Sequence, residues 1–136
     1  MVISMTKVMG EDINQCYSLL FTAEGELRNG CPVKALLCFE NCRKLALSFI
    51  KVSPVYVHCL FRAARKESQL LRFLGMDVRA YKRLKVLSRK VQDPVFCLDV
   101  FFVYVQLYDL SLLHDPKLSV MYFDKMNAIA ECLNKA

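Results

Sequence analysis

The sequence predicts an all-α protein whose helices stack as antiparallel pairs. Long stretches carry apolar side chains three and four positions apart, the spacing of one buried helix face. Short breaks between these stretches hold most of the chain's four glycines and four prolines. A similar seven-residue phrase also recurs three times at the breaks, at intervals of about 45 and 39 residues, which lies in the period range of helical repeat arrays.

Each copy of the phrase ends in a small residue, and a large apolar residue follows four positions later. The copies are residues 29–35 (NGCPVKA), 74–80 (LGMDVRA) and 113–119 (LHDPKLS), and the pairs are Ala35 with Phe39, Ala80 with Leu84, and Ser119 with Phe123. A small residue lets two helices touch, and a bulky residue one turn later fills the space beside the contact. The pattern therefore predicts stacked helical hairpins, an architecture typical of binding scaffolds rather than of catalysts.

The first hairpin is expected from a helix over about 4–28 and a second over about 32–52. Asn29-Gly30 ends the first helix, because Gly30 readily takes the left-handed conformation of a helix stop. Pro32 suits the first turn of the second helix, where its missing N–H group costs nothing. The inward residues are Cys16, Leu19, Leu20, Ala23 and Leu27 in the first helix and Ala35, Leu36, Phe39, Cys42, Leu45, Ala46 and Phe49 in the second.

The second and third hairpins follow from three start signals. Ser53-Pro54 predicts an N-cap and a first helical position for a third helix that ends near Gly75, and Asp77 is expected to cap the fourth. Asp93-Pro94 and Asp115-Pro116 repeat the cap-and-proline signal for the fifth and sixth helices, which run to about His114 and nearly to Ala136. The inward stripe of the fourth helix is Ala80, Leu84, Leu87 and Val91.

These breaks and stripes resemble the tetratricopeptide repeat family. The matching positions are Gly30, Ala35, Phe39 and Cys42 in the first hairpin, Gly75, Ala80, Leu84 and Leu87 in the second, and His114, Ser119, Phe123 and Met126 in the third. The resemblance implies three degenerate hairpins stacked as an α-solenoid in a single domain over residues 1–136, with the first helix of each hairpin lining an inner wall. A generic helical solenoid and a closed helical bundle remain alternatives.

The composition favours an intracellular protein with a large core or an apolar binding surface. The 136 residues are 55% apolar and 24% charged, more apolar than is usual for a soluble domain. The seven cysteines are odd in number and scattered along apolar stretches, and no leader pattern opens the chain, so we expect reduced thiols in the cytoplasm or nucleus, without disulfides or a bound metal. Asp99 and Asp109 interrupt the most apolar stretch, residues 95–113, which argues against a membrane span.

Catalytic motifs are missing from the sequence, so we expect neither an enzyme nor a cofactor. His58 and Cys59 are adjacent, and adjacent helical residues point about 100° apart instead of facing each other. Cys38 and Cys42 share a face, but no second pair follows to complete a zinc site. No glycine-rich phosphate loop is present.

The positive charge is concentrated in the middle hairpin. Between Arg62 and Lys90 there are ten basic residues and two acidic ones, whereas the net charge of the whole chain is +6. With the inner wall that the resemblance implies, this predicts a groove for an acidic partner segment with large apolar side chains, since arginine pairs bidentately with carboxylates and aromatic residues anchor partners. The expected partner-binding residues are Arg62, Arg65, Lys66, Gln69, Arg72, Phe101, Tyr104 and Tyr108.

Other functions remain open at this point. The basic region 62–90 would also suit a helical domain that binds nucleic acid, with an affinity that falls steeply with salt. A compact bundle acting as a small regulator is a further alternative. The fifth helix is apolar almost all the way round, and no polar helix follows the sixth, so another protein or a second copy of the chain is expected to cover the carboxyl-terminal helices.

Overall fold

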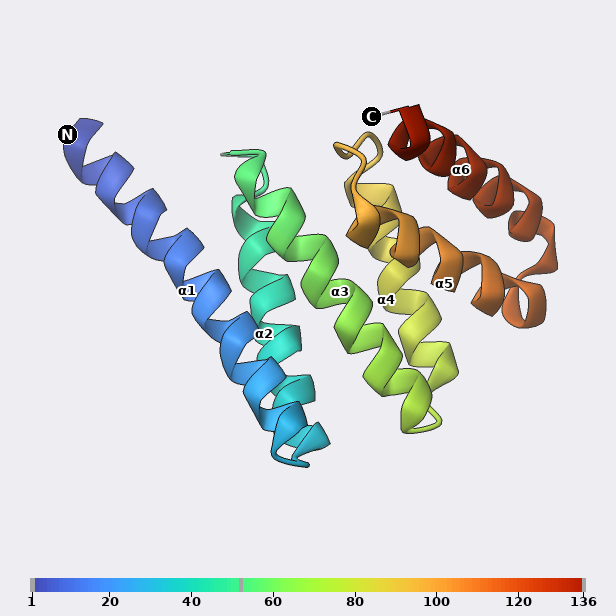
Figure 1. The fold of residues 1–136 in the computed structure, drawn as a ribbon, viewed down its shortest axis with the longest axis horizontal. Helices are drawn as coiled ribbons and strands as arrows, with labels where there is room; N and C mark the ends of the chain where they lie inside the picture. Colours follow the sequence, from blue (N-terminus) through green and yellow to red (C-terminus); the bar gives the residue numbers. More distant parts are fainter. Residues whose placement is uncertain (1, 52, 136) are drawn as a thin grey trace. The chain divides into compact units, whose positions relative to one another are not determined.

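The computed structural model describes the backbone of residues 2–51 and 53–135 and the side chains from residue 12 onward within those ranges. Over these residues it contains six helices and no strand, which confirms the predicted all-α class (Figure 1). The helices are α1 (Val2–Arg28), α2 (Pro32–Phe49), α3 (Val55–Phe73), α4 (Asp77–Lys90), α5 (Leu98–His114) and α6 (Pro116–Lys135).

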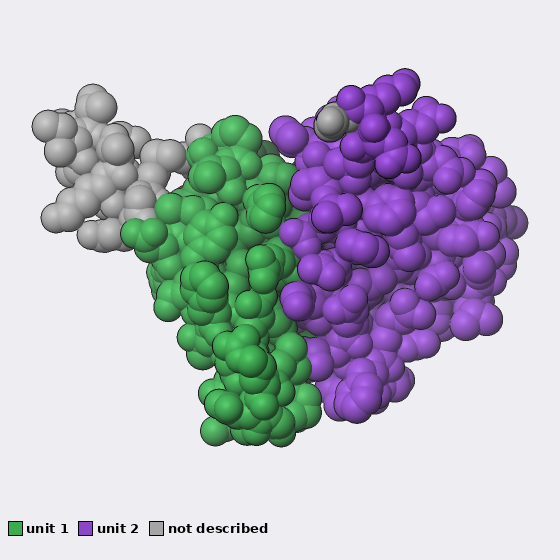
Figure 2. Space-filling view, viewed as in Figure 1, with its two compact units in different colours: residues 1–63 green, residues 64–136 purple. Residues whose placement is uncertain are grey.

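The chain divides into two compact units, residues 1–63 and 64–136, and the boundary falls within α3 (Figure 2). The first unit contains α1, α2 and the first half of α3. The second contains the rest of α3 with α4, α5 and α6. The single domain over residues 1–136 stays a prediction.

Two of the predicted turns are built in the same way. Gly30 and Gly75 have φ angles of 75° and 78°, in the left-handed region that glycine enters without strain. At the first turn the amides of Gly30 and Cys31 donate to carbonyl oxygens of Leu27 and Glu26, and at the second the amides of Gly75 and Met76 donate to Arg72 and Leu71. These bonds satisfy carbonyl groups that the ends of α1 and α3 would otherwise leave unpaired.

The first unit is closed by α1 packed along α2, with the start of α3 completing the core. Its fully or almost fully buried apolar residues are Cys16, Leu20 and Ala23 of α1, Ala35, Phe39, Cys42 and Ala46 of α2, and Tyr56, Cys59, Leu60, Phe61 and Ala63 of α3. α3 begins at Val55, one residue later than the Ser53-Pro54 signal predicts, and the Ser53 hydroxyl oxygen accepts a hydrogen bond from the Val55 amide at 3.3 Å.

Cysteines from the three helices of the first unit meet in this core. The sulfur of Cys42 lies 3.6 Å from the sulfur of Cys59, and its thiol donates to the carbonyl oxygen of Cys16 at 3.3 Å. Burial, followed by the proximity of Cys59, raises the pKa of Cys16 to about 12. Cys16 and Cys42, whose pKa values are both raised, therefore behave as small, un-ionised core residues.

We expect alkylation to separate these thiols from the surface ones. Iodoacetamide at pH 8 should modify Cys132, which is exposed on α6, and should leave Cys16 and Cys42 unmodified until the protein is unfolded. The reason is that the thiolate is the reactive form, and burial hides both sulfurs. Burial also raises the pKa of Cys16, while the hydrogen bond with Cys59, followed by burial, raises the pKa of Cys42. Peptide mass spectrometry of native and urea-unfolded samples measures this, and rapid native labelling of Cys16 would contradict the packing.

The second unit has α5 at its centre, packed against both α4 and α6. Its buried apolar residues include Ala80, Tyr81, Leu84 and Leu87 of α4, Val100, Val103, Tyr104, Leu107 and Leu110 of α5, and Tyr122 and Ile129 of α6. The small residue of every repeated phrase is buried: Ala35, Ala80 and Ser119 are at most 8% exposed. The large residues differ, because Phe39 and Leu84 are buried whereas Phe123 is 42% exposed.

Two predicted helix starts are wrong. The fifth helix begins at Leu98 rather than at Asp93-Pro94, because Cys97 is extended (φ −149°, ψ 175°) and the first helical hydrogen bond joins the Phe101 amide to the Cys97 carbonyl. Asp77 is the first residue of α4, not its cap; Met76 holds the cap position without a side-chain hydrogen bond. Tertiary packing overrides the local signal in the first case, since the Phe96 ring lies 5.2 Å from the Lys125 ammonium group of α6.

No helix within the described residues is both long enough and apolar enough to cross a membrane.

Candidate interaction surface

In the second unit, side chains of α3 and α5 contact one another. The Arg65 guanidinium donates to Asp99 at 2.9 Å and lies 5.4 Å from the centre of the Phe102 ring, and the Gln106 side chain donates to the Arg65 carbonyl at 3.2 Å. Further along both helices, seven residues on in α3 and ten in α5, Arg72 lies 3.8 Å from Asp109. These contacts bring Arg65 and Arg72 of α3 against the apolar α5.

One face of α5 is apolar and open to solvent. Its members are Leu98, Phe101, Phe102, Val105, Tyr108 and Leu112, which we call the α5 strip. Leu98 is 65% exposed, Phe102 40% and Leu112 48%, and the others are half-buried. The strip extends onto α6, because the Tyr108 ring lies 5.3 Å from the Phe123 ring. Large apolar side chains left in contact with water along a helix are typical of an interaction site.

The predicted residues divide between this face and other places. Arg65 and Arg72 are half-buried on α3 beside the strip. Lys66, half-buried, and Gln69, exposed, lie on the same helix. Phe101 and Tyr108 belong to the strip itself. Arg62 belongs to the first unit, where its guanidinium donates to Glu24 at 2.6 Å.

Tyr104 lies away from the α5 strip. It is 5% exposed, its ring is 6.4 Å from that of Tyr122, and burial raises its pKa. Tyr104 follows Phe101 by three positions and precedes Tyr108 by four, so a modest rotation about the helix axis decides which of the three is covered. Here Tyr104 lies on the side of α5 that faces α6, so α6 covers it.

The arginines beside the strip are partly neutralised within the protein. Asp99 is only 9% exposed and accepts from Arg65, and the exposed Asp109 stands near Arg72. A carboxylate that already holds an arginine reduces the attraction of that arginine for an acidic ligand. The positive charge available to a partner therefore lies elsewhere on the second unit.

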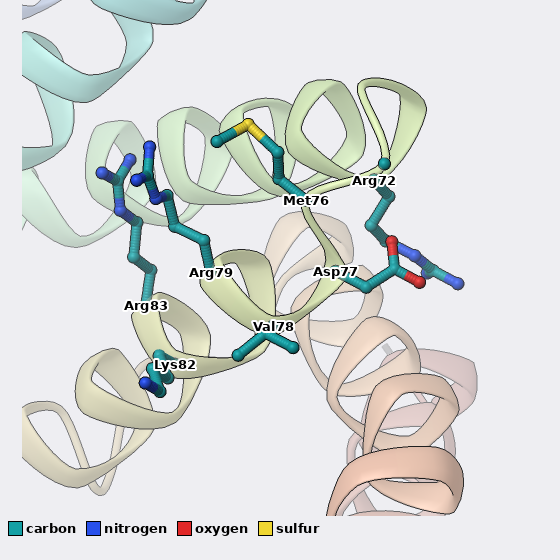
Figure 3. Close-up of a pocket in the computed structure, with 8 residues that line it drawn as sticks. Arg72, Met76, Asp77, Val78, Arg79, Lys82 and Arg83 are labelled. Atoms are coloured by element: carbon teal, nitrogen blue, oxygen red, sulfur yellow. The ribbon is translucent and has the colours of Figure 1, made fainter.

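That charge surrounds a cavity of about 760 Å³ at the turn between α3 and α4, which we call the turn pocket. It is lined by Arg72, Gly75, Met76, Asp77, Val78, Arg79, Lys82 and Arg83. Figure 3 shows the Arg79 and Arg83 side chains extending next to each other from α4, with Arg72 and Asp77 across the turn. Arg79 and Lys82 are exposed, and no ion pair joins either of them to another described residue.

Arg83 differs from its neighbours because it holds a buried carboxylate. It donates to Glu67 of α3 at 2.9 Å, and Glu67 is only 1% exposed. A carboxylate removed from water in this way needs a cation and hydrogen bonds close by. Arg83 thus has a structural role, whereas Arg79 and Lys82 face solvent.

Four residues of the α5 strip were not predicted from the sequence to be exposed. Leu98, Phe102, Val105 and Leu112 were part of an apolar run that predicted either burial or a partner, without distinguishing the two sides of the helix. Their exposure depends on how α5 is rotated against α4 and α6, and a run that is apolar on all sides carries no information about that rotation.

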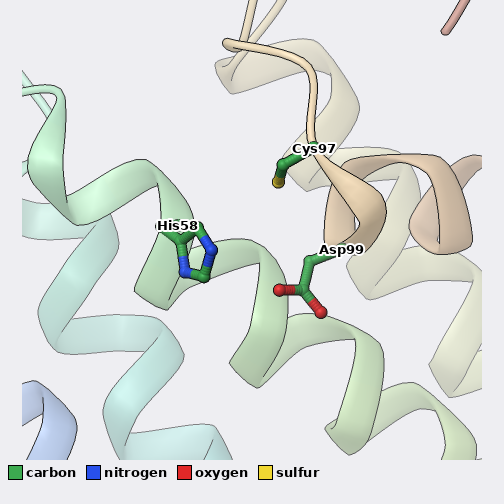
Figure 4. A group of neighbouring side chains, drawn as sticks. All are labelled: His58, Cys97 and Asp99. Carbon is green, nitrogen blue, oxygen red and sulfur yellow. The ribbon is translucent and has the colours of Figure 1, made fainter. Parts of the chain in front are cut away.

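Figure 4 shows Cys97 and Asp99 at the amino end of α5, and His58 on α3. His58 belongs to the first unit and the other two to the second, so we assign no joint site to them. The expectation of a protein without metal, cofactor or catalytic residues stays a prediction.

Comparison of the chain with protein-family models, with curated proteins and with solved structures gave no match. The resemblance to tetratricopeptide repeats therefore stays a prediction.

Proposed function

We propose that this protein is a non-catalytic interaction module that binds an acidic, partly hydrophobic segment of another protein on its second unit. The observation that carries the proposal is the α5 strip, an exposed row of large apolar and aromatic side chains on a packed helix. Aromatic residues in such a row supply most of the binding energy in protein interfaces, and surrounding polar groups exclude water.

The geometry also supports one orientation for the proposed partner. Arg72 lines the turn pocket and also approaches Asp109 near the carboxyl end of α5, so the pocket lies at that end of the α5 strip. A partner whose apolar side chains cover the strip would therefore place its acidic residues near Arg79 and Lys82. Those cations attract a carboxylate without displacing an internal one.

We expect replacement of Tyr108 with alanine to weaken partner binding by about 2 kcal/mol, or about thirtyfold in Kd, chiefly through faster dissociation. Tyr108 is the residue to test because it is half-exposed and ends the aromatic row, whereas removing the buried Tyr104 would perturb the core. Surface plasmon resonance with a partner isolated from native lysate measures both rates.

Matched variants distinguish binding at the α5 strip from non-specific hydrophobic binding. Leu112→Asp places a charge within the α5 strip and should abolish binding. Val33→Asp changes an apolar residue of α2 that is somewhat more exposed, 61% against 48%, and should leave binding intact. Lys82→Glu should mainly slow association, because it reverses a steering charge. Equal loss with Leu112→Asp and Val33→Asp would contradict the proposal.

Nucleic-acid binding is the second candidate, favoured by the exposed Arg79, Lys82, Arg89 and Lys90 of α4. It predicts a steep fall in affinity with salt and indifference to Tyr108→Ala. Binding of a short duplex and of a single strand, followed between low and high salt, distinguishes the two functions.

A further inference from the structure

A second cavity in the second unit, of about 400 Å³, lies where the carboxyl end of α4 meets α5 and α6. Its lining includes Lys85 and Arg89 of α4, Tyr104 of α5, and Met121, Tyr122 and Lys125 of α6; we call it the α4–α6 pocket. This volume is within the range of cavities that bind small organic molecules. The pocket is separate from the α5 strip, because Tyr104 points away from that strip into the α6 side of the helix.

Positive groups dominate this pocket. Among the described residues, its lining contains no aspartate or glutamate, and neither Arg89 nor Lys125 forms an ion pair. Lys125 is held by the Phe96 ring at 5.2 Å, which fixes the position of the ammonium group without neutralising its charge. Lys85 is partly neutralised, since its ammonium group lies 3.2 Å from Asp115.

The remainder of the pocket is aromatic and apolar. Tyr104 and Tyr122 are 5% and 2% exposed and form its buried side, and Met121, at 54%, stands at the rim. Burial raises the pKa of Tyr104, so its phenol keeps its proton at neutral pH. A protonated phenol can donate a hydrogen bond to an anion, and the methionine side chain adapts to an apolar group.

We infer that the α4–α6 pocket binds a small organic anion in which a phosphate or carboxylate is attached to an aromatic ring. The anionic group would meet Arg89 and Lys125, and the ring would lie against Tyr104, Tyr122 and Met121. The inference does not depend on the proposed partner site, because it rests on different residues. It predicts that both parts of the ligand are needed, since separate cationic and aromatic surfaces line one cavity.

Phenyl phosphate is a suitable probe, because it combines the two groups in one small molecule. Titration of the protein, followed by calorimetry and by the NMR signal of the Met121 methyl group, should show saturable binding. Inorganic phosphate and phenol, which each carry one half of the probe, should bind at least tenfold more weakly. Equal affinity for inorganic phosphate, or no saturation by phenyl phosphate, would overturn the inference.

The chain supplies matched controls for the charges. Arg89→Gln and Lys125→Gln should each weaken phenyl phosphate binding about tenfold, while Lys90→Gln and Lys117→Gln remove the same charge from α4 and α6 outside the pocket and should have little effect. The replaced side chains make no ion pair with another described residue, and circular dichroism verifies that the variants fold. Equal loss in all four variants would reduce the effect to net charge and refute a defined site.

Discussion

Replacing Arg83 with methionine is expected to lower the free energy of unfolding by about 3 kcal/mol, because it leaves the Glu67 carboxylate, 1% exposed, without its guanidinium partner. Arg79→Met is the matched control, one turn earlier on α4 at an exposed position without an ion pair to another described residue, and should change stability by no more than about 0.5 kcal/mol. Urea denaturation of both variants measures the difference.

A double variant separates loss of the ion pair from loss of packing. In Glu67→Leu/Arg83→Met the buried charge is gone as well, and apolar side chains of similar size replace the pair, so much of the lost stability should return. Equal stability of the two single variants, Arg83→Met and Arg79→Met, would show that the Glu67 contact contributes nothing.

The second large effect is expected at Phe39, which is fully buried between the helices of the first hairpin. Phe39→Ala should cost about 4 kcal/mol, the sum of the lost burial and the cavity that remains. The equivalent position of the third phrase, Phe123, is 42% exposed, so Phe123→Ala should cost less than about 1 kcal/mol. Thermal melts of the two variants therefore test how far the repeat has diverged, and similar losses would mean that Phe123 is a core residue.

Local signals along the chain predicted most of the fold. Gly30 and Gly75 mark the turns because no other residue enters their backbone conformation without strain, and Ala35 and Ala80 mark the helix contacts because larger side chains would not fit. The Asp93-Pro94 signal failed for a different reason. The segment that follows is held extended by contacts with α6, and local propensity carries no information about such distant contacts.

The candidate site was harder to predict, because it depends on pairs far apart in the sequence. Periodicity placed Arg65 and Arg72 on one face of α3. Their carboxylate partners Asp99 and Asp109 lie more than thirty residues away and become neighbours only where α5 contacts α3 in the fold. The division of α5 into a buried side with Tyr104 and an open side with Tyr108 likewise follows from its rotation in the second unit. An apolar run predicts that a helix is covered. It does not indicate which side packs within its own chain and which side is left for a partner.

If the proposed partner reaches Arg65, the Asp99 carboxylate determines which anionic groups it can bind there. A carboxylate from a partner that replaced it at Arg65 would exchange one monovalent anion for another, with little net gain. A phosphate group carries nearly twice the charge and three acceptor oxygens, so it competes with the internal aspartate on better terms. This part of the surface would therefore discriminate between the phosphorylated and unphosphorylated forms of one and the same partner segment.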